Sequence, residues 1–428
     1  MSYFSYKNGV LHAENVALTA ISQQFGSPTY IYSKAALTAN FSAYANACKQ
    51  HSREADGALI CYSVKSNSNL AVLQLLNQLG SGFDIVSGGE LLRVIAAGGD
   101  PSKVIFSGVG KSREEMRLAL SHDILCFNVE SIPELHRLNE VAGAMGKRAA
   151  ISLRVNPDVD AKTHPYISTG LKENKFGVAY DDALSCYRTA AALPHIDVAG
   201  IDCHIGSQLL DDAPMLEALD KLIELVDQLA GEGIHLHHLD IGGGIGITYD
   251  DEQPVVIGDY LARLFARINA WREEKYQGAP IKVMFEPGRS IVGNAGILLT
   301  EVQYLKHSEA KNFAVVDAAM NDLMRPALYE AWHGVQTVSQ RGTEAQVYDV
   351  VGPVCESGDW LARSRSLAIE AGDLLALMSA GAYGMTMSSN YNTRGRAAEV
   401  MVDGAQVHLI RRRENPADLF ALESLISP

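Results

Sequence analysis

Four stretches of this 428-residue chain place reactive side chains directly after short, β-branched runs. Lys65 follows one run, His204 another, the glycine loop Gly242–Gly246 a third, and Glu286-Pro-Gly-Arg289 a fourth. A lysine desolvated beside other cations is a nucleophilic amine that forms a Schiff base with a carbonyl compound. An aldehyde cofactor is therefore the expected occupant of such a site.

Each of these residues also has a plainer interpretation. A lysine at a strand end usually extends its ammonium to water, a single histidine is usually a packed core residue, and a glycine loop can be a simple turn. Glu286 and Arg289 could merely pair with one another. Together they indicate pyridoxal phosphate, because a carboxylate keeps its ring nitrogen protonated and glycine N–H groups bind its phosphate.

Two nucleotide-binding motifs are excluded by their spacing. The dinucleotide pattern G-x-G-x-x-G fails because its last glycine, counted from Gly242, is Ile247. The stretch SGVGKS (107–112) resembles the end of a P-loop, but Ile105 stands where the first glycine is required.

An alternation of strand-like and helix-like segments sets the positions of these residues. Helical spacing of apolar residues recurs between the runs, for example over 211–231. Strand and helix alternating eight times predict a closed (β/α)8 barrel, whose active site lies at the carboxyl ends of its strands. The predicted strands are 58–64, 83–86, 104–106, 124–127, 150–155, 198–204, 237–241 and 281–285.

The chain after Pro287 is predicted to be mostly β. It contains strand-like runs without long helices, and Asp403-Gly404 between two alternating runs is a strong hairpin signal. The stretch before Pro28 is expected to join this part. We therefore predict a cofactor-binding barrel over 28–290 and a β-rich domain formed by 1–27 and 291–428.

Composition limits the partners. Hydrophobic residues are 47% of the chain, charged residues are 20%, and the formal net charge is -14. Such a surface repels nucleic acid and anionic lipid, so a small-molecule partner is expected. The sequence shows no signal peptide and no apolar run of about 20 residues, which predicts a cytoplasmic protein without a membrane segment.

Cysteines and histidines give no metal signature. The six cysteines form no Cys-x-x-Cys pair, and we expect buried thiols except at Cys355, which lies among polar residues in CESGD. The histidines of HLHHLD (235, 237 and 238) border a predicted strand on alternating faces, which favours packing over metal binding. No metal is expected.

Long motifs, in order along nearly the whole chain, resemble the diaminopimelate decarboxylase family, within the alanine-racemase-like fold type III class of pyridoxal-phosphate enzymes. YSVKSN departs from the family pattern, which has alanine before the lysine and Ala-Asn after it, but the lysine is intact. The motifs are YSVKSN, FDIVSGGEL, RVNPDVDAKTHPYISTGLKENKFG, GIDCHIGSQ, DIGGGIGI, EPGRSIV, DAAMNDLMRPALYEA, GPVCESGD and GAYGMTMSSNYN.

The resemblance implies decarboxylation of meso-2,6-diaminopimelate to L-lysine and CO2, the last step of lysine synthesis. Lys65 would then hold the cofactor covalently, His204 would stack on its ring, and Glu286 would face the ring nitrogen. The remaining cofactor-binding residues implied are Asp84, which ends the second predicted strand, with Ser207, Gly243, Gly244, Gly288, Arg289 and Tyr383.

The same resemblance implies a substrate site shared across a homodimer. Arg325 and Tyr329, with Arg289 and Tyr383, would bind substrate, and Cys355 and Glu356 would come from the second subunit. The proton that replaces the lost carboxylate would come from the Cys355 thiol or from Lys65. The acid Glu356 with the cation Arg325 suits a substrate whose far end carries both an amine and a carboxylate, and disfavours L-lysine and L-ornithine.

Three other functions are weighed against this one. An alanine racemase shares the barrel class but needs a second base opposite Lys65 and has little use for Arg325 or Glu356. A small pyridoxal-phosphate-binding homeostasis protein would be a single barrel, without the C-terminal 140 or so residues. A regulator similar to antizyme inhibitor would have lost the cofactor, which the presence of Lys65, Glu286 and Cys355 disfavours.

Overall fold

In the computed structural model, which describes residues 3–53, 58–160, 174–275 and 281–426, the eight predicted runs form eight parallel strands. Each strand pairs with the next, β8 pairs with β9, and β13 pairs back with β5, so the sheet closes into a barrel. The predicted barrel is confirmed. Its strands are β5 (Leu59–Ser63), β6 (Gly82–Ile85), β7 (Val104–Phe106), β8 (Cys126–Val129), β9 (Ala149–Asn156), β11 (Ile196–Asp202), β12 (His238–Asp240) and β13 (Lys282–Phe285).

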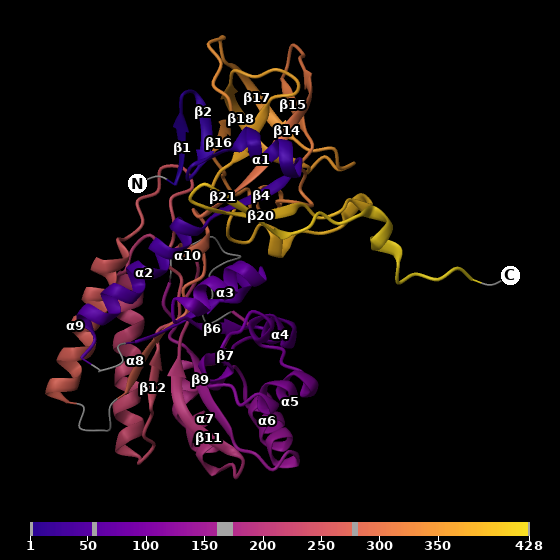
Figure 1. The fold of residues 1–428 in the computed structure, drawn as a ribbon. Coiled ribbons are helices and arrows are strands. Elements are labelled where there is room, and N and C mark those ends of the chain that lie inside the picture. Colours follow the sequence, from indigo (N-terminus) through magenta and orange to yellow (C-terminus); the bar gives the residue numbers. More distant parts are fainter. Residues whose placement is uncertain (1–2, 54–57, 161–173, 276–280, 427–428) are drawn as a thin grey trace. The chain divides into compact units, whose positions relative to one another are not determined.

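Helices cover the outside of these strands (Figure 1). Several begin where a side-chain oxygen accepts a hydrogen bond from the first-turn backbone, and Ser112 forms a full capping box with Glu115. These caps define where each strand-to-helix turn ends. The helices are α2 (Lys34–His51), α3 (Leu70–Gln78), α4 (Gly88–Ala96), α5 (Arg113–Ser121), α6 (Ile132–Ala144), α7 (Tyr180–Ala192), α8 (Ala213–Gly231) and α9 (Ile257–Glu274); a two-residue strand, β10 (Val178–Ala179), pairs with β9.

The barrel interior changes from apolar to polar along the strands. A buried cluster fills its lower part with Leu59, Cys61, Ile105, Cys126 and Met284. Because side chains two residues apart point the same way from a strand, the next inward positions lie nearer the carboxyl ends. Those positions are polar and buried: Ser63, Asp84, Ser107, Asn128, Asp202, Asp240 and Glu286.

A second compact unit contains most of the other strands, and we call it the β unit. It comprises Met1–Ala39, Thr248–Glu252 and Ile291–Pro428, and the barrel unit comprises Asn40–Ile247 and Gln253–Ser290. Its strands are β1 (Phe4–Lys7), β2 (Val10–Ala13), β3 (Val16–Ala17), β4 (Thr29–Ser33), β14 (Gly296–Lys306), β15 (Phe313–Val316), β16 (Val335–Thr337), β17 (Gln346–Val351), β18 (Trp360–Leu367), β19 (Leu374–Leu377), β20 (Ala398–Asp403) and β21 (Gln406–Arg411), with the helices α1 (Leu18–Phe25) and α11 (Arg325–Tyr329).

The N-terminal residues join this unit through both sheet and core. β4 pairs with β14 and with β20, and Leu11, Leu18 and Ile31 pack with Ile297 and Val400 in one hydrophobic cluster. The predicted hairpin is present: Asp403 pairs with Gln406, and Gly404 begins the two-residue loop with φ +61°.

Two features of the chain bear on the sequence predictions. The unit boundary by contacts lies at Ala39/Asn40, within α2, whereas the sequence suggested Pro28. This difference arises because β4, which follows Pro28, pairs in the β sheet.

Across the described ranges, the helices that were found are too short or too polar to cross a bilayer.

Candidate active site

Lys65 lies at the carboxyl end of the first barrel strand. β5 ends at Ser63, and a single 3-10 turn, Val64–Ser66, then presents Lys65; the sequence had placed the strand end one residue later. Its ammonium lies 2.8 Å from Oδ2 of Asp84 on β6. Asp84 is fully buried, whereas 35% of the Lys65 side chain is exposed. The amine is therefore oriented by a buried carboxylate and still open to a small molecule.

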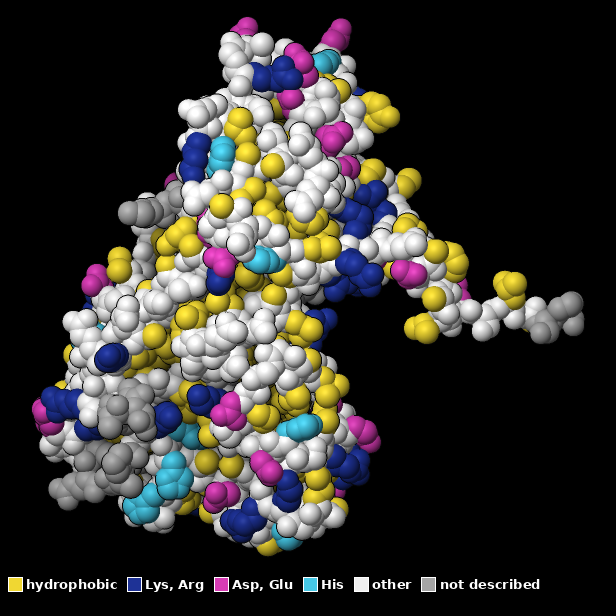
Figure 2. Space-filling model, in the orientation of Figure 1, with side chains coloured by type: hydrophobic (Ala, Val, Ile, Leu, Met, Phe, Trp, Pro, Cys, Tyr) yellow, Lys and Arg dark blue, Asp and Glu magenta, His cyan; other side chains and the backbone are white. Residues whose placement is uncertain are grey.

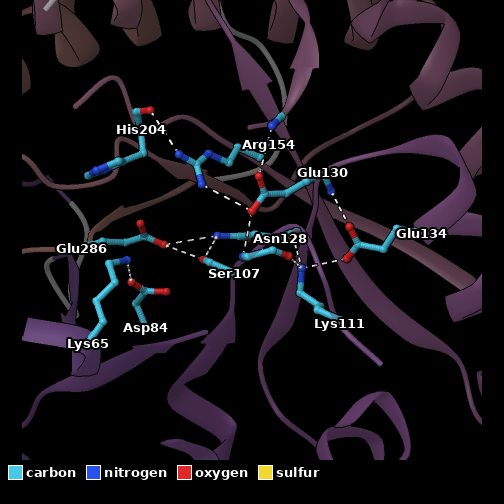
Figure 3. A network of polar contacts seen from close by, with 12 residues as sticks. Lys65, Asp84, Ser107, Lys111, Asn128, Glu130, Glu134, Arg154, His204 and Glu286 are labelled. Atoms are coloured by element: carbon cyan, nitrogen blue, oxygen red, sulfur yellow. Dashed lines mark hydrogen bonds and ion pairs between the residues drawn. The ribbon is translucent and has the colours of Figure 1, made fainter. Parts of the chain in front are cut away.

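Glu286 follows β13 and is buried (Figure 3). Its Oε1 accepts hydrogen bonds from the Asn128 amide at 3.2 Å and the Ser107 hydroxyl at 3.5 Å. Burial, and then the neighbouring acids Asp84, Asp240 and Asp202, raise the pKa of Glu286 well above its usual value. The charge of the Lys65 ammonium acts against that rise.

His204 follows β11 and lies at the glycine loop. Its Nδ1 accepts a hydrogen bond from the Gly243 backbone N–H at 3.2 Å, which leaves the ring hydrogen on Nε2. Burial and the charges of Arg154 and Lys65 lower the pKa of His204 well below its usual value. The imidazole is therefore neutral and suited to stack on an aromatic ring.

The loop after β12 leaves no room for side chains. A Cβ on Gly243 would lie 2.1 Å from the Glu286 carbonyl oxygen, and one on Gly244, where φ is +116°, would lie 2.5 Å from the Gly206 carbonyl oxygen. Only glycine fits these positions, so bare backbone lines this part of the mouth. Asp240 stabilises the loop by accepting the Gly242 N–H at 2.8 Å.

An arginine lies on the same side of the barrel unit. Arg289 donates from Nε and Nη2 to the Ser207 hydroxyl, at 3.2 and 3.1 Å. Gly288 packs against Ser63, where a Cβ would approach to 2.9 Å. A cation, a hydroxyl and exposed backbone are the groups that bind phosphate. With the amine, the imidazole and the buried carboxylate, this donor set fits pyridoxal phosphate.

Arg325, in the β unit, is a buried cation. Its Nη1 lies 2.8 Å from Nε2 of His333, and its guanidinium carbon lies 4.4 Å from the centre of the Tyr249 ring. Tyr329 ends the same short helix and is half-buried. Such a guanidinium, oriented by an aromatic face and a histidine, can bind a carboxylate.

Tyr383 has an unusual backbone in the same unit. Its φ is +55°, a left-handed conformation that is uncommon for an aromatic residue. The following residue must be glycine, because a Cβ on Gly384 would lie 2.7 Å from the Tyr30 hydroxyl. Strained backbone of this kind is frequent at functional sites.

Cys355 and Glu356 lie in an exposed turn of the β unit. Cys355 is exposed and the other five cysteines are buried, as the sequence predicted. Asp359 accepts the Val354 N–H at 2.7 Å, and the Asn392 side chain accepts the Cys355 N–H at 3.0 Å. The Tyr391 hydroxyl donates to Glu356 at 2.9 Å. The turn is thus structured although its thiol and carboxylate face outward.

Sequence reasoning missed several interior residues of the barrel. Asn128, Asp202, Asp240 and Arg154 were not identified, although each is a polar residue within a β-branched run. Polar residues at alternate positions of a buried strand point to one face, and this pattern could have identified them as interior residues. Arg154 pairs with Glu130 at 3.4 Å and donates to the His204 carbonyl at 3.3 Å (Figure 3).

The P-loop-like stretch and the histidine-rich stretch have structural roles. Lys111 is buried and bonds to Glu134 and to the Gly108 and Asn128 carbonyls, so it positions the ends of β7 and β8. His238 is buried with Nε2 2.5 Å from the Ser152 hydroxyl, whereas His235 and His237 are exposed. Residues 161–173 of the long family motif lie outside the described residues.

Comparison with known proteins extends over the full length. The family model of the pyridoxal-dependent decarboxylases, pyridoxal binding domain, matches residues 41–293. The diaminopimelate decarboxylase of Pseudomonas aeruginosa is 58% identical, with 100% of both chains covered, and that of Vibrio cholerae is 56% identical with the same coverage. This chain belongs to the diaminopimelate decarboxylase family.

The solved structures agree with that membership. The diaminopimelate decarboxylase of Helicobacter pylori, complexed with L-lysine, superimposes with a TM-score of 0.88 at 42% identity and covers 95% of this chain and 99% of its own. Members of this family are pyridoxal-dependent enzymes, and pyridoxal phosphate is the cofactor of this one. Lys65, His204, Glu286 and the glycine loop are its candidate ligands.

Proposed function

We propose that this protein decarboxylates meso-2,6-diaminopimelate to L-lysine and CO2, the last step of lysine biosynthesis. The observation that carries the proposal is the convergence of Lys65, His204, Glu286 and the glycine loop at the carboxyl ends of one barrel, in a chain 58% identical to a diaminopimelate decarboxylase. Bound pyridoxal phosphate supplies a ring that accepts the electron pair left when CO2 departs.

Each residue of the barrel mouth has a defined task in this proposal. The Lys65 amine would hold the aldehyde group of the cofactor, and Asp84 orients that amine from 2.8 Å. The Glu286 carboxylate would accept a hydrogen bond from the protonated ring nitrogen and so keep that nitrogen protonated, and the neutral His204 imidazole would stack on the ring. Phosphate oxygens are held by backbone N–H groups of the glycine loop, with Ser207, Arg289 and Tyr383.

A proton must reach the former α-carbon after CO2 is lost. The Cys355 thiol and the Lys65 amine are the two candidate donors. The exposed position of Cys355 on a structured turn supports its contribution to a site on another molecule. Which of the two donates is decided by the Cys355 substitution described below.

The far end of the substrate is bound by charge. Arg325, with Tyr329 and Arg289, binds the distal carboxylate, and Glu356 binds the distal amine. L-lysine and L-ornithine lack that carboxylate and would not form the charge pair with Arg325, at a cost of several kcal/mol, roughly 3 or more. We therefore expect strong discrimination against both.

The proposal includes a cytoplasmic homodimer in which Cys355 and Glu356 complete the site of the partner. Exposed apolar side chains on the C-terminal segment support an interface, namely Phe420, Leu422, Leu425 and Ile426 (Figure 2). The last three are 96% or more exposed in the single chain. Large apolar side chains on one segment are rarely left in water.

The test is an assay of the purified protein loaded with pyridoxal phosphate. We expect stoichiometric CO2 and L-lysine from meso-diaminopimelate, and turnover of L-ornithine and L-lysine lower by about 10²-fold or more. Comparable decarboxylation of L-ornithine would overturn the substrate assignment. Interconversion of amino-acid enantiomers without CO2 release would assign the protein to the racemases instead.

A further inference from the structure

Three acidic side chains gather beneath the mouth of the barrel. Asp202 ends β11, Asp240 ends β12 and Glu286 follows β13, and one carboxylate oxygen of each lies within 4.8 Å of the others. Asp202 and Asp240 are register partners in adjacent parallel strands. All three are buried, with at most 4% exposure.

The three acids differ in their hydrogen-bond donors. Glu286 Oε1 accepts bonds from Asn128 and Ser107, and Asp240 Oδ1 accepts the Gly242 N–H. Among the described residues, Asp240 Oδ2, Asp202 Oδ1 and Asp84 Oδ1 are buried and have no donor, but the other oxygen of Asp84 accepts a bond from the Lys65 ammonium at 2.8 Å. A buried oxygen without a donor is destabilising. One hydrogen shared between two such oxygens would satisfy both.

Acids outnumber cations at this place when the three cluster members are counted. Acids Asp84 and Glu130 face the cluster in addition to its own three members, whereas two cations, Lys65 and Arg154, act on it. The other titratable neighbours are the thiols of Cys61, Cys126 and Cys203 and the imidazole of His204, and burial disfavours the charged form of each. Adjacent buried carboxylates cannot all ionise.

The acidities of the cluster agree with a retained proton. Burial raises the pKa of Asp202 to about 7, and it raises the pKa of Asp240 well above the usual value, with Asp202 as the next cause. Two interacting acids titrate as a pair rather than as separate groups. The position of the proton is then decided by which oxygens already have donors.

We propose that Asp202 and Asp240 hold one proton between them and that Glu286 therefore remains ionised. The proton resides on this pair because the two acids occupy adjacent register positions and each has a buried oxygen without a donor. The Glu286 carboxylate is stabilised by Asn128 and Ser107 (Figure 3 shows these two contacts), and the Asp84 carboxylate is paired with the Lys65 ammonium. Asp202 and Asp240 are positioning residues, since they act on the cofactor through Glu286. That consequence rests on the function proposed above, whereas the shared proton does not.

The test is infrared spectroscopy of the holoenzyme at pH 7, without turnover. A protonated carboxylic acid has a carbonyl stretch separate from the carboxylate bands, and the band shifts in D2O. The variants are Asp202→Asn, Asp240→Asn and Glu286→Gln. The control is Asp197→Asn, which makes the same change on the same strand at an exposed position. An asparagine amide can replace the shared proton by donating to the remaining carboxylate, so both aspartate variants are expected to fold.

We expect a buried carboxylic acid band in the wild type that disappears in Asp202→Asn and in Asp240→Asn and persists in Glu286→Gln and in the control. Loss of the band in Glu286→Gln with retention in Asp240→Asn would place the proton on Glu286 and overturn the proposal. Absence of the band in the wild type, or its appearance only after a chelator removes a bound cation, would also overturn it. If one aspartate variant fails to fold, the other variant and the wild type still decide.

The same preparations distinguish this inference from the proposed function. CO2 release from meso-diaminopimelate is assayed separately on the wild type. Absence of decarboxylation with the expected band pattern would refute the function and leave the shared proton intact. Decarboxylation together with a band that is assigned to Glu286 would support the function and refute the shared proton.

Discussion

The barrel mouth and the exposed turn at 352–359 hold their candidate residues in opposite environments. In the mouth, Asp84 and Glu286 are buried and hydrogen-bonded by residues from several strands. In the turn, Cys355 and Glu356 are exposed, and the bonds that hold the turn come mainly from its backbone. The mouth gathers an amine, an imidazole, a buried carboxylate and bare backbone, whereas the turn presents a thiol and a carboxylate on an exposed surface.

Because of this contrast, we expect substitutions in the two regions to have different effects. A buried polar group that loses its partner is destabilised in place, so substitutions in the mouth affect cofactor binding and stability together. An exposed group has no such dependence, and its substitution affects only the surface that it meets. The predictions below test that division, beginning with the largest expected effect.

Lys65→Ala in the mouth is expected to abolish the visible absorption of the bound cofactor and to lower turnover by at least about 10³-fold, because the amine that holds the aldehyde is lost. Absorbance after incubation with pyridoxal phosphate and a CO2 assay measure both effects. Lys103→Ala, at the amino end of β7, is the control and should change neither. A Lys65→Ala enzyme with normal turnover would refute the site.

Mixing two inactive variants separates the two regions. Lys65→Ala and Cys355→Ala, refolded together in equal amounts, should recover about a quarter of wild-type turnover, because half of the dimers are hybrids with one intact site of two. The control mixture, Lys65→Ala with Glu286→Gln, should recover no turnover. Lys65 and Glu286 both belong to the barrel of their own subunit, so each subunit of the hybrid has a defective barrel. Equal recovery in the two mixtures would exclude a shared site. Unchanged turnover of Cys355→Ala alone would remove its thiol from the chemistry.

Arg325→Gln tests the cation of the β unit. We expect kcat/KM for meso-diaminopimelate to fall by about 10²-fold, as for the loss of one partner of a buried charge pair, with a normal cofactor spectrum. Arg363→Gln is the matched control, because that guanidinium also lies over an aromatic ring, Trp360, but is exposed. An equal loss in the control would argue against a specific role for Arg325.

The last prediction concerns stability, not turnover, and the barrel interior. Burial lowers the pKa of His238 to about 4 in the folded chain. In the unfolded chain this histidine has the ordinary pKa of about 6.5, so it is protonated there at a higher pH than in the folded chain. Because of His238, the free energy of unfolding therefore decreases by about 3 kcal/mol as the pH falls from 7 to 4. Urea unfolding of His238→Gln should show a correspondingly shallower loss, and the exposed His237→Gln should match the wild type.

Much of the fold was predictable because it depends on local pattern. Alternating apolar runs placed all eight barrel strands, and Asp403-Gly404 identified the hairpin. The strand β4 was not recognised as part of the β sheet, since its sequence does not indicate which of two sheets it joins.

The candidate site was predictable only in part. Reactive residues at strand ends, such as Lys65 and Glu286, could be found because the barrel requires active-site groups there. Asn128 could not, since its bond to Glu286 joins residues 158 positions apart in the chain.

The sequence by itself determined the alternation of strands and helices, the chemical groups available and membership in a family of decarboxylases. Those properties follow from side-chain type and spacing, which the chain carries in any conformation. The tertiary structure alone decided which acids share a barrel interior, which Glu286 oxygen accepts its two donors, and that Cys355 is exposed while five other thiols are buried. The reason is that strand register and closure of the barrel set those distances and the local burial, and both depend on pairings between residues far apart in the chain.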